Sequence, residues 1–172
     1  MKRQAMLFPA LVVGILALVA VGGASAKKPA LSATPVFKLG LKPSQEVPPI
    51  RDLEARAKGT VTFDLERSPA GAITSGEVIF SFNYSFPSSV TLTGLHIHQG
   101  AKRTNGDIVV NSGLASVADA DGKGNVTFVA SGTPPATLQA ILDKPRGYYV
   151  NLHTSVNPGG ALRAQMRNPK KG

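Results

Sequence analysis

The stretch EVIFSFNYSF, residues 77–86, has the clearest alternation of side chains in the protein. Side chains along a β-strand point alternately to the two faces of the sheet, so residues two apart share a face. Strict period two over this length predicts a strand with one face in the core. The side chains expected on the core face are Val78, Phe80, Phe82, Tyr84 and Phe86.

Outward from this stretch, the chain consists of short segments of the same kind, separated by turns rich in Gly and Pro. About eight strands at regular spacing predict an all-β sandwich or barrel. One helical pattern interrupts them, from Thr133 to about Leu142, with Thr133 as the expected N-cap and proline in the first turn. The other strands are expected at residues 36–39, 59–65, 90–98, 107–110, 126–130, 146–153 and 161–166.

The strand at residues 90–98 changes phase within its length. Leu92 has one parity, but Leu95 and Ile97 have the other, and Gly94 stands between them. One inserted residue shifts the phase in this way, and glycine tolerates the geometry of a β-bulge. With Leu95 and Ile97 facing the core, we expect His96 and His98 to emerge together on the opposite face.

The third of the three histidines in the chain, His153, shares a polar strand face with Tyr149 and Asn151. If its strand lies near that of His96 and His98, the three imidazoles can meet. Imidazole suits copper, zinc and nickel, and three imidazoles form a common metal site. Two other roles also fit the pattern, namely hydrogen bonds that anchor loops and direct contact with an organic ligand.

Acidic residues give weaker signals. Asp107 together with Asp119 and Asp121 could hold a hard cation such as calcium, but aspartate is favoured in turns in any case. Glu46 and Glu77 are isolated in the sequence, and we assign them no role.

The N-terminus has the three parts of a secretory signal peptide: Lys2 and Arg3, an apolar run over residues 6–21, and an Ala-x-Ala end at Ala26. A permanent anchor is the alternative. Cleavage after Ala26 would leave a linker at residues 27–34, one domain at residues 35–168 and a disordered tail at residues 169–172. The chain has no cysteine, which excludes a lipid-modified cysteine anchor. We therefore expect export to a periplasm, a cell surface or the medium, with no transmembrane segment in the mature chain.

The formal net charge of +9 is spread along the chain. Nucleic-acid-binding proteins concentrate basic residues on one face or helix, often with stacking aromatics, and that pattern is missing here. The sequence therefore indicates no nucleic-acid partner. Attraction to anionic cell-envelope surfaces is the expected effect of the charge.

Three motifs in order resemble the CHRD domain family: QEVPP at residues 45–49, LHIHQG at residues 95–100, and YVNLHT at residues 149–154 followed by P-x-GALRAQ at residues 158–165. The resemblance covers about residues 35–168. It implies an exported single-domain protein of a family whose bacterial members mostly have no assigned activity.

The same segments are similar, more distantly, to copper–zinc superoxide dismutase. That resemblance implies an eight-stranded antiparallel Greek-key fold, with His96, His98 and His153 as copper ligands and Arg163 as a guide for an anionic substrate. The zinc loop, the bridging histidine, the fourth histidine and the disulfide of that family have no counterpart here. The expected fold class is thus an all-β Greek-key sandwich or barrel, superoxide-dismutase-like or immunoglobulin-like, with one short helix.

Three functions follow from these expectations. The first is a non-catalytic binding module with a mononuclear site for copper or, as second choice, zinc. The second is a copper-dependent redox enzyme acting on superoxide. The third is a structural or adhesive extracellular β domain whose histidines bond to loop backbone.

Overall fold

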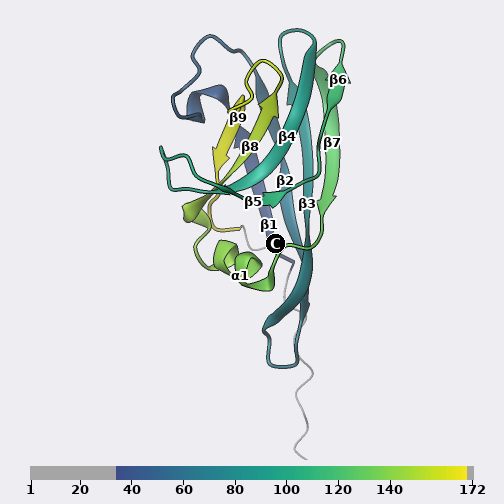
Figure 1. Ribbon diagram of the computed structural model, residues 1–172, viewed down its shortest axis with the longest axis vertical. Helices are drawn as coiled ribbons and strands as arrows, with labels where there is room; N and C mark the ends of the chain where they lie inside the picture. The colour runs from purple at the N-terminus through teal and green to yellow at the C-terminus, as the bar shows by residue number, and fades with distance from the viewer. Residues whose placement is uncertain (1–33, 170–172) are drawn as a thin grey trace, which may run out of the picture. The chain divides into compact units, whose positions relative to one another are not determined.

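The computed structural model describes residues 34–169. The predicted signal peptide, nearly all of the predicted linker and most of the predicted tail lie outside these residues. Nine strands form two antiparallel sheets within the described part of the chain. Figure 1 shows the two sheets stacked face to face, which confirms the predicted all-β sandwich.

The first sheet has the strand order β1-β2-β3-β7. The clear alternation at residues 77–86 falls in β3 and the residue after it, Phe86, and all five side chains predicted for the core are buried. Strands β2 and β3 form a long hairpin in which Val61 pairs with Phe80 and Phe63 with Val78. The strands of this sheet are β1 (Val36–Leu41), β2 (Arg56–Arg67), β3 (Ile73–Ser85) and β7 (Lys123–Ala130).

The second sheet has the order β5-β4-β8-β9, and β6 pairs with a separate part of β4. Its central strand pair, β4 and β8, carries the three histidines. The strand β6 spans three residues and was not expected from the sequence. The strands are β4 (Val90–Gln99), β5 (Ile108–Asn111), β6 (Val117–Asp119), β8 (Tyr148–Thr154) and β9 (Leu162–Gln165).

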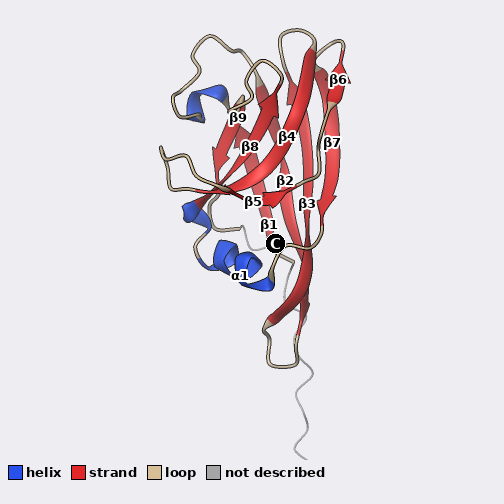
Figure 2. Cartoon of the chain, viewed as in Figure 1, coloured by secondary structure: helices blue, strands red, loops and turns tan. Residues whose placement is uncertain are grey.

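The core lies between the sheets and is built from aromatic and branched side chains. The helix α1 (Pro135–Asp143) closes one end, packs against β3, and buries Leu138 and Ile141 (Figure 2). The helix was predicted, but the prediction of Thr133 as its N-cap is wrong, since Pro134 occupies the N-cap and no side chain caps the helix. The largest buried apolar side chains from the two sheets are Phe37, Phe63, Phe80, Phe82, Leu41, Leu92, Leu95 and Ile97.

Two short 3₁₀ turns complete the secondary structure, η1 (Pro43–Gln45) and η2 (Pro145–Gly147). Turn η1 begins the segment that carries Glu46 toward the outer face of the second sheet. None of the helices within residues 34–169 is long and apolar enough to cross a lipid bilayer.

Candidate metal centre

The three histidines come from two neighbouring strands and lie side by side on the outer face of the second sheet. His96 and His98 belong to β4, and His153 belongs to β8, opposite Gly94 in the antiparallel register. The ring centroids are 4.8 Å apart for His96 and His153, and 5.6 Å apart for each of the other two pairs. One ligand atom from each ring lies within 4.8 Å of those of the other two, so this group could hold a metal ion.

The change of phase in β4 places the two histidines of that strand. The pairing of β4 with β8 shifts register between Leu92 and Gly94, where the sequence predicted a bulge. A Cβ atom at Gly94 would lie 2.6 Å from Cε1 of His96, closer than van der Waals contact allows. The glycine is therefore needed to let the His96 ring lie against the strand beside His153.

Hydrogen bonds fix which nitrogens are free. Nδ1 of His98 lies 2.9 Å from the carbonyl oxygen of Gly106, and Nδ1 of His153 lies 2.9 Å from that of Pro158. Because a carbonyl only accepts, Nδ1 must donate in both rings, which leaves the lone pair on Nε2 when the ring is neutral. The prediction that these histidines anchor loops is thus confirmed for His98 and His153.

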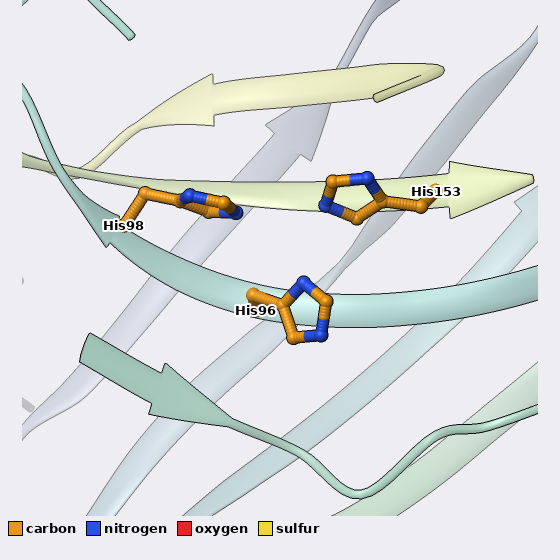
Figure 3. Close-up of side chains that lie close together, drawn as sticks. All are labelled: His96, His98 and His153. Carbon is orange, nitrogen blue, oxygen red and sulfur yellow. The ribbon is translucent and has the colours of Figure 1, made fainter. Parts of the chain in front are cut away.

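The nitrogens that remain are buried and have no partner: Nε2 of His98, Nε2 of His153 and Nδ1 of His96. Figure 3 shows one nitrogen of each ring directed toward a common space between the rings. Buried polar atoms are rarely left unpaired. Three unpaired lone pairs converging on one point form the donor set of a metal site, and metal-bound histidines commonly donate their other N–H to a carbonyl.

The surroundings keep the rings neutral. Burial is the main reason that the pKa values of all three are lowered, and the pKa of His96 falls to about 4, with smaller contributions from His153 and His98. His98 and His153 are only 7% and 9% exposed, although the sequence suggested a polar strand face. Neutral imidazole is the form that binds metal, so the cluster is ready for a cation at neutral pH.

Tyr149 and Arg163 support the cluster from the neighbouring positions. The Tyr149 ring stacks on His98, and the guanidinium carbon of Arg163 lies 3.4 Å from the centre of the Tyr149 ring. Arg163 is only 1% exposed and donates hydrogen bonds to Asn105 Oδ1 and to the carbonyl oxygens of Ala101 and Thr104. The structure therefore places Arg163 near the histidines, but as a buried side chain that holds the loop between β4 and β5.

Glu46 is the buried residue that sequence reasoning missed. It is 5% exposed, and its Oε2 accepts a hydrogen bond of 3.4 Å from Nδ2 of Asn151, the residue opposite His96. Burial raises the pKa of Glu46 to about 7, although the charge of Arg163 and the bond from Asn151 oppose the shift. The only sequence signal was its place in the motif QEVPP.

The aspartates considered for a hard cation do not gather. Asp107 precedes β5, whereas Asp119 lies in β6, which pairs with the opposite end of β4. Asp119 accepts hydrogen bonds from the Tyr84 hydroxyl and from the backbone N–H groups of Asp121 and Gly122. Asp119 and Asp121 therefore serve the turn after β6, as the alternative interpretation predicted, and Glu77 is exposed on β3.

Comparison with known proteins agrees with the motifs that surround these residues. Neither among curated proteins nor among solved structures was a match to the chain found, so the likeness to superoxide dismutase stays a prediction. The family model of the CHRD domain matches residues 37–166. This range includes all three histidines and every strand, apart from the first residue of β1. The chain therefore belongs to the CHRD domain family.

Proposed function

We propose that this protein is an exported, non-catalytic binding module that holds one transition-metal ion between His96, His98 and His153. The observation that carries the proposal is the convergence of three buried, unpaired ring nitrogens, together with backbone carbonyls that fix the other ring nitrogen of His98 and of His153. Copper is the first choice and zinc the second, because both accept neutral imidazole ligands in sites of this kind.

Export is part of the same proposal. The CHRD family is of an extracellular type, and the N-terminal sequence has the pattern of a signal peptide that ends at Ala26. A protein whose first residue is Lys27, identified by mass spectrometry in the periplasm or medium of the source cells, supports this part. Retention of residues 1–26 on a membrane would contradict it.

A binding role is favoured over a redox enzyme because of Arg163. An enzyme acting on superoxide needs a positive group that a small anion can approach. The guanidinium of Arg163 is buried, lies over the Tyr149 ring and donates to three acceptors within the protein. The histidines hold the metal in this proposal, and no residue is assigned to act on a substrate.

The test is a calorimetric titration of the chelator-treated protein with Cu(II) and with Zn(II) at pH 7.5. We expect one tight site per chain. The variants are chosen to keep the loop bonds: in His98→Asn and His153→Asn the amide nitrogen takes the place of Nδ1, but no group replaces Nε2. In His96→Gln the amide nitrogen takes the place of Nε2, and no group replaces Nδ1.

Each of these three variants should fold and lose tight binding, by about 100-fold or more. Asp119→Asn is the matched control, because Asp119 serves a turn at the far end of β4, and it should bind as the parent does. Tight binding that survives in all three histidine variants, or no binding at micromolar metal, contradicts the metal site. The latter result would favour the structural role of these histidines. Rapid loss of superoxide with the copper-loaded protein would contradict the non-catalytic part of the proposal.

A further inference from the structure

A hollow of about 550 Å³ opens beside the segment that carries Glu46, the loop after β4 and the end of β9. We call it the cationic pocket. Among the residues that line it, Glu46 is the only acidic one, whereas five are basic. These five residues are Lys102, Arg103, Arg146, Arg163 and Arg167.

The basic residues reach the pocket from three separate segments. Lys102 and Arg103 belong to the loop after β4, Arg146 belongs to η2, and Arg163 and Arg167 lie on and after β9. Four of them are exposed, and only Arg163 is buried. A hollow lined by charges of one sign focuses the electrostatic field and attracts ligands of the opposite sign. The pocket therefore favours an anion.

Two oxygens of residues that line the pocket point to a second chemical requirement. Oε1 of Glu46 and Oε1 of Gln165 are buried and have no hydrogen-bond partner. The Gln165 amide cannot turn around without loss, because three carbonyl oxygens surround its Nε2 and its two N–H groups are shared among them: those of Gly100, Arg146 and Tyr148, at 2.9, 2.9 and 2.7 Å. Its Oε1 can therefore be satisfied only by a hydrogen-bond donor, which an ionised carboxylate does not carry.

We propose that the cationic pocket binds an acidic saccharide, that is, a sugar chain that bears carboxylate groups. The carboxylates pair with the exposed arginines, which bind carboxylates through two parallel hydrogen bonds. The sugar hydroxyls donate to the free oxygens of Gln165 and Glu46. The volume lies within the range of small-molecule sites and suits a fragment of a few sugar rings. This binding requires no metal and goes beyond the function proposed above.

The test is a calorimetric titration of the metal-free protein with trigalacturonate at pH 7.5 and 150 mM salt, where long-range charge effects are screened. The comparison ligands are maltotriose, which has hydroxyls but no charge, and inorganic phosphate, which has charge but no sugar hydroxyls. The pocket variant is Arg103→Gln combined with Arg146→Gln, both exposed positions. Lys58→Gln, an exposed charge on β2 of the other sheet, is the matched control.

We expect trigalacturonate to bind with one site per chain and at least about tenfold more tightly than either comparison ligand. The pocket variant should weaken it about tenfold or more, and the control should not. Equal binding of inorganic phosphate would overturn the saccharide assignment, and equal binding of maltotriose would overturn the role of the charges. Absence of binding at millimolar trigalacturonate, or equal loss in Lys58→Gln, would overturn the pocket. None of these outcomes depends on metal, so they are distinguishable from failure of the histidine site.

Discussion

The ring of Tyr149 lies parallel to the imidazole of His98, with centroids 4.8 Å apart and planes inclined by 8°. Arg163 contacts the same tyrosine ring from β9, on the side of β8 away from β4. The tyrosine is thus held between a candidate ligand and a buried cation. Because a ligand ring that cannot rotate loses less freedom on binding metal, this stack orients His98 for its proposed role.

Replacing Tyr149 tests this orientation. Tyr149→Phe keeps the stacked ring and loses only the hydroxyl, which accepts from the N–H of Gly106 at 3.2 Å. Tyr149→Leu loses the stack itself. We expect metal affinity to fall about 10- to 100-fold in Tyr149→Leu, the range found for groups that support metal ligands, and much less in Tyr149→Phe. A competition titration against a chelator measures both, and equal affinities in the two variants would show that the stack does not matter.

Gly94→Ala is expected to disturb the cluster without unfolding the domain. The added methyl group meets Cε1 of His96 at 2.6 Å, so the imidazole must move away from His153. We expect metal affinity to fall at least tenfold, while the circular dichroism spectrum of the sandwich is retained. Gly40→Ala is the control, since a Cβ at Gly40 of β1 meets no atom within 4 Å. Unchanged metal binding in Gly94→Ala would mean that the position of His96 is not needed.

Acid is expected to destabilise the metal-free protein through the histidines. The pKa of His96 is about 4 in the folded protein and 6.5 in the unfolded chain. Between these values the unfolded chain binds more protons, so the free energy of unfolding decreases as the pH falls from 6.5 to 4 and levels off below. The slope from one imidazole is at most about 1.4 kcal/mol per pH unit.

Urea unfolding of the parent and of His96→Gln at pH 8, 6 and 4.5 isolates this contribution, because the other titrating groups are common to both. The parent should lose more stability than the variant on going from pH 8 to pH 4.5. Parallel curves for the two proteins would contradict the lowered pKa of His96.

Glu46 should have the opposite pH dependence. The folded protein retains a proton on this buried carboxyl up to a pKa of about 7, whereas the unfolded chain releases it near 4.5. The contribution of Glu46 to stability is therefore lost as the pH rises from 4.5 to 7. Glu46→Gln stays neutral, so relative to the parent it should be more stable at pH 8.5 than at pH 4.5, by on the order of 2–3 kcal/mol. The same pair of measurements on Glu77→Gln, which replaces an exposed carboxyl on β3, is the matched control for the substitution itself.

The fold could be predicted because most of its strands have recognisable local sequence patterns. Alternation in residues 77–86 and the phase change at Gly94 depend only on neighbours in the chain, and both are present in the structure. The strand β6 was missed because three residues are too few to show a period. The proximity of His153 to His96 and His98 was expected only if their two strands were neighbours. The local sequence of a strand does not show which distant strand it pairs with.

The burial of the site is what the sequence did not reveal. Tyr149, Asn151 and His153 alternate with apolar residues, which is the pattern of a strand with one face in solvent. The structure covers that face with chain from elsewhere: Asn105 and Gly106 from the loop after β4, Pro158 from the turn after β8, and Glu46 from the segment after η1. A local pattern cannot foresee which loops fold over a strand, so Glu46 looked isolated.

Strand β8 is buried at every one of its seven positions. Its inward side chains pack in the hydrophobic core between the sheets. Its outward side chains pack in a small polar cluster that contains imidazoles, amides, a carboxyl group and a guanidinium. We therefore expect substitutions to be poorly tolerated on both sides of this strand. On the inward side the new side chain must match the volume of the old one, and on the outward side it must keep the same hydrogen-bond partners. A saturation-mutagenesis scan should therefore find seven consecutive intolerant positions here, whereas the exposed side of β3 should accept most substitutions. The domain is in effect a three-layered object made from two sheets, with loops as the third layer.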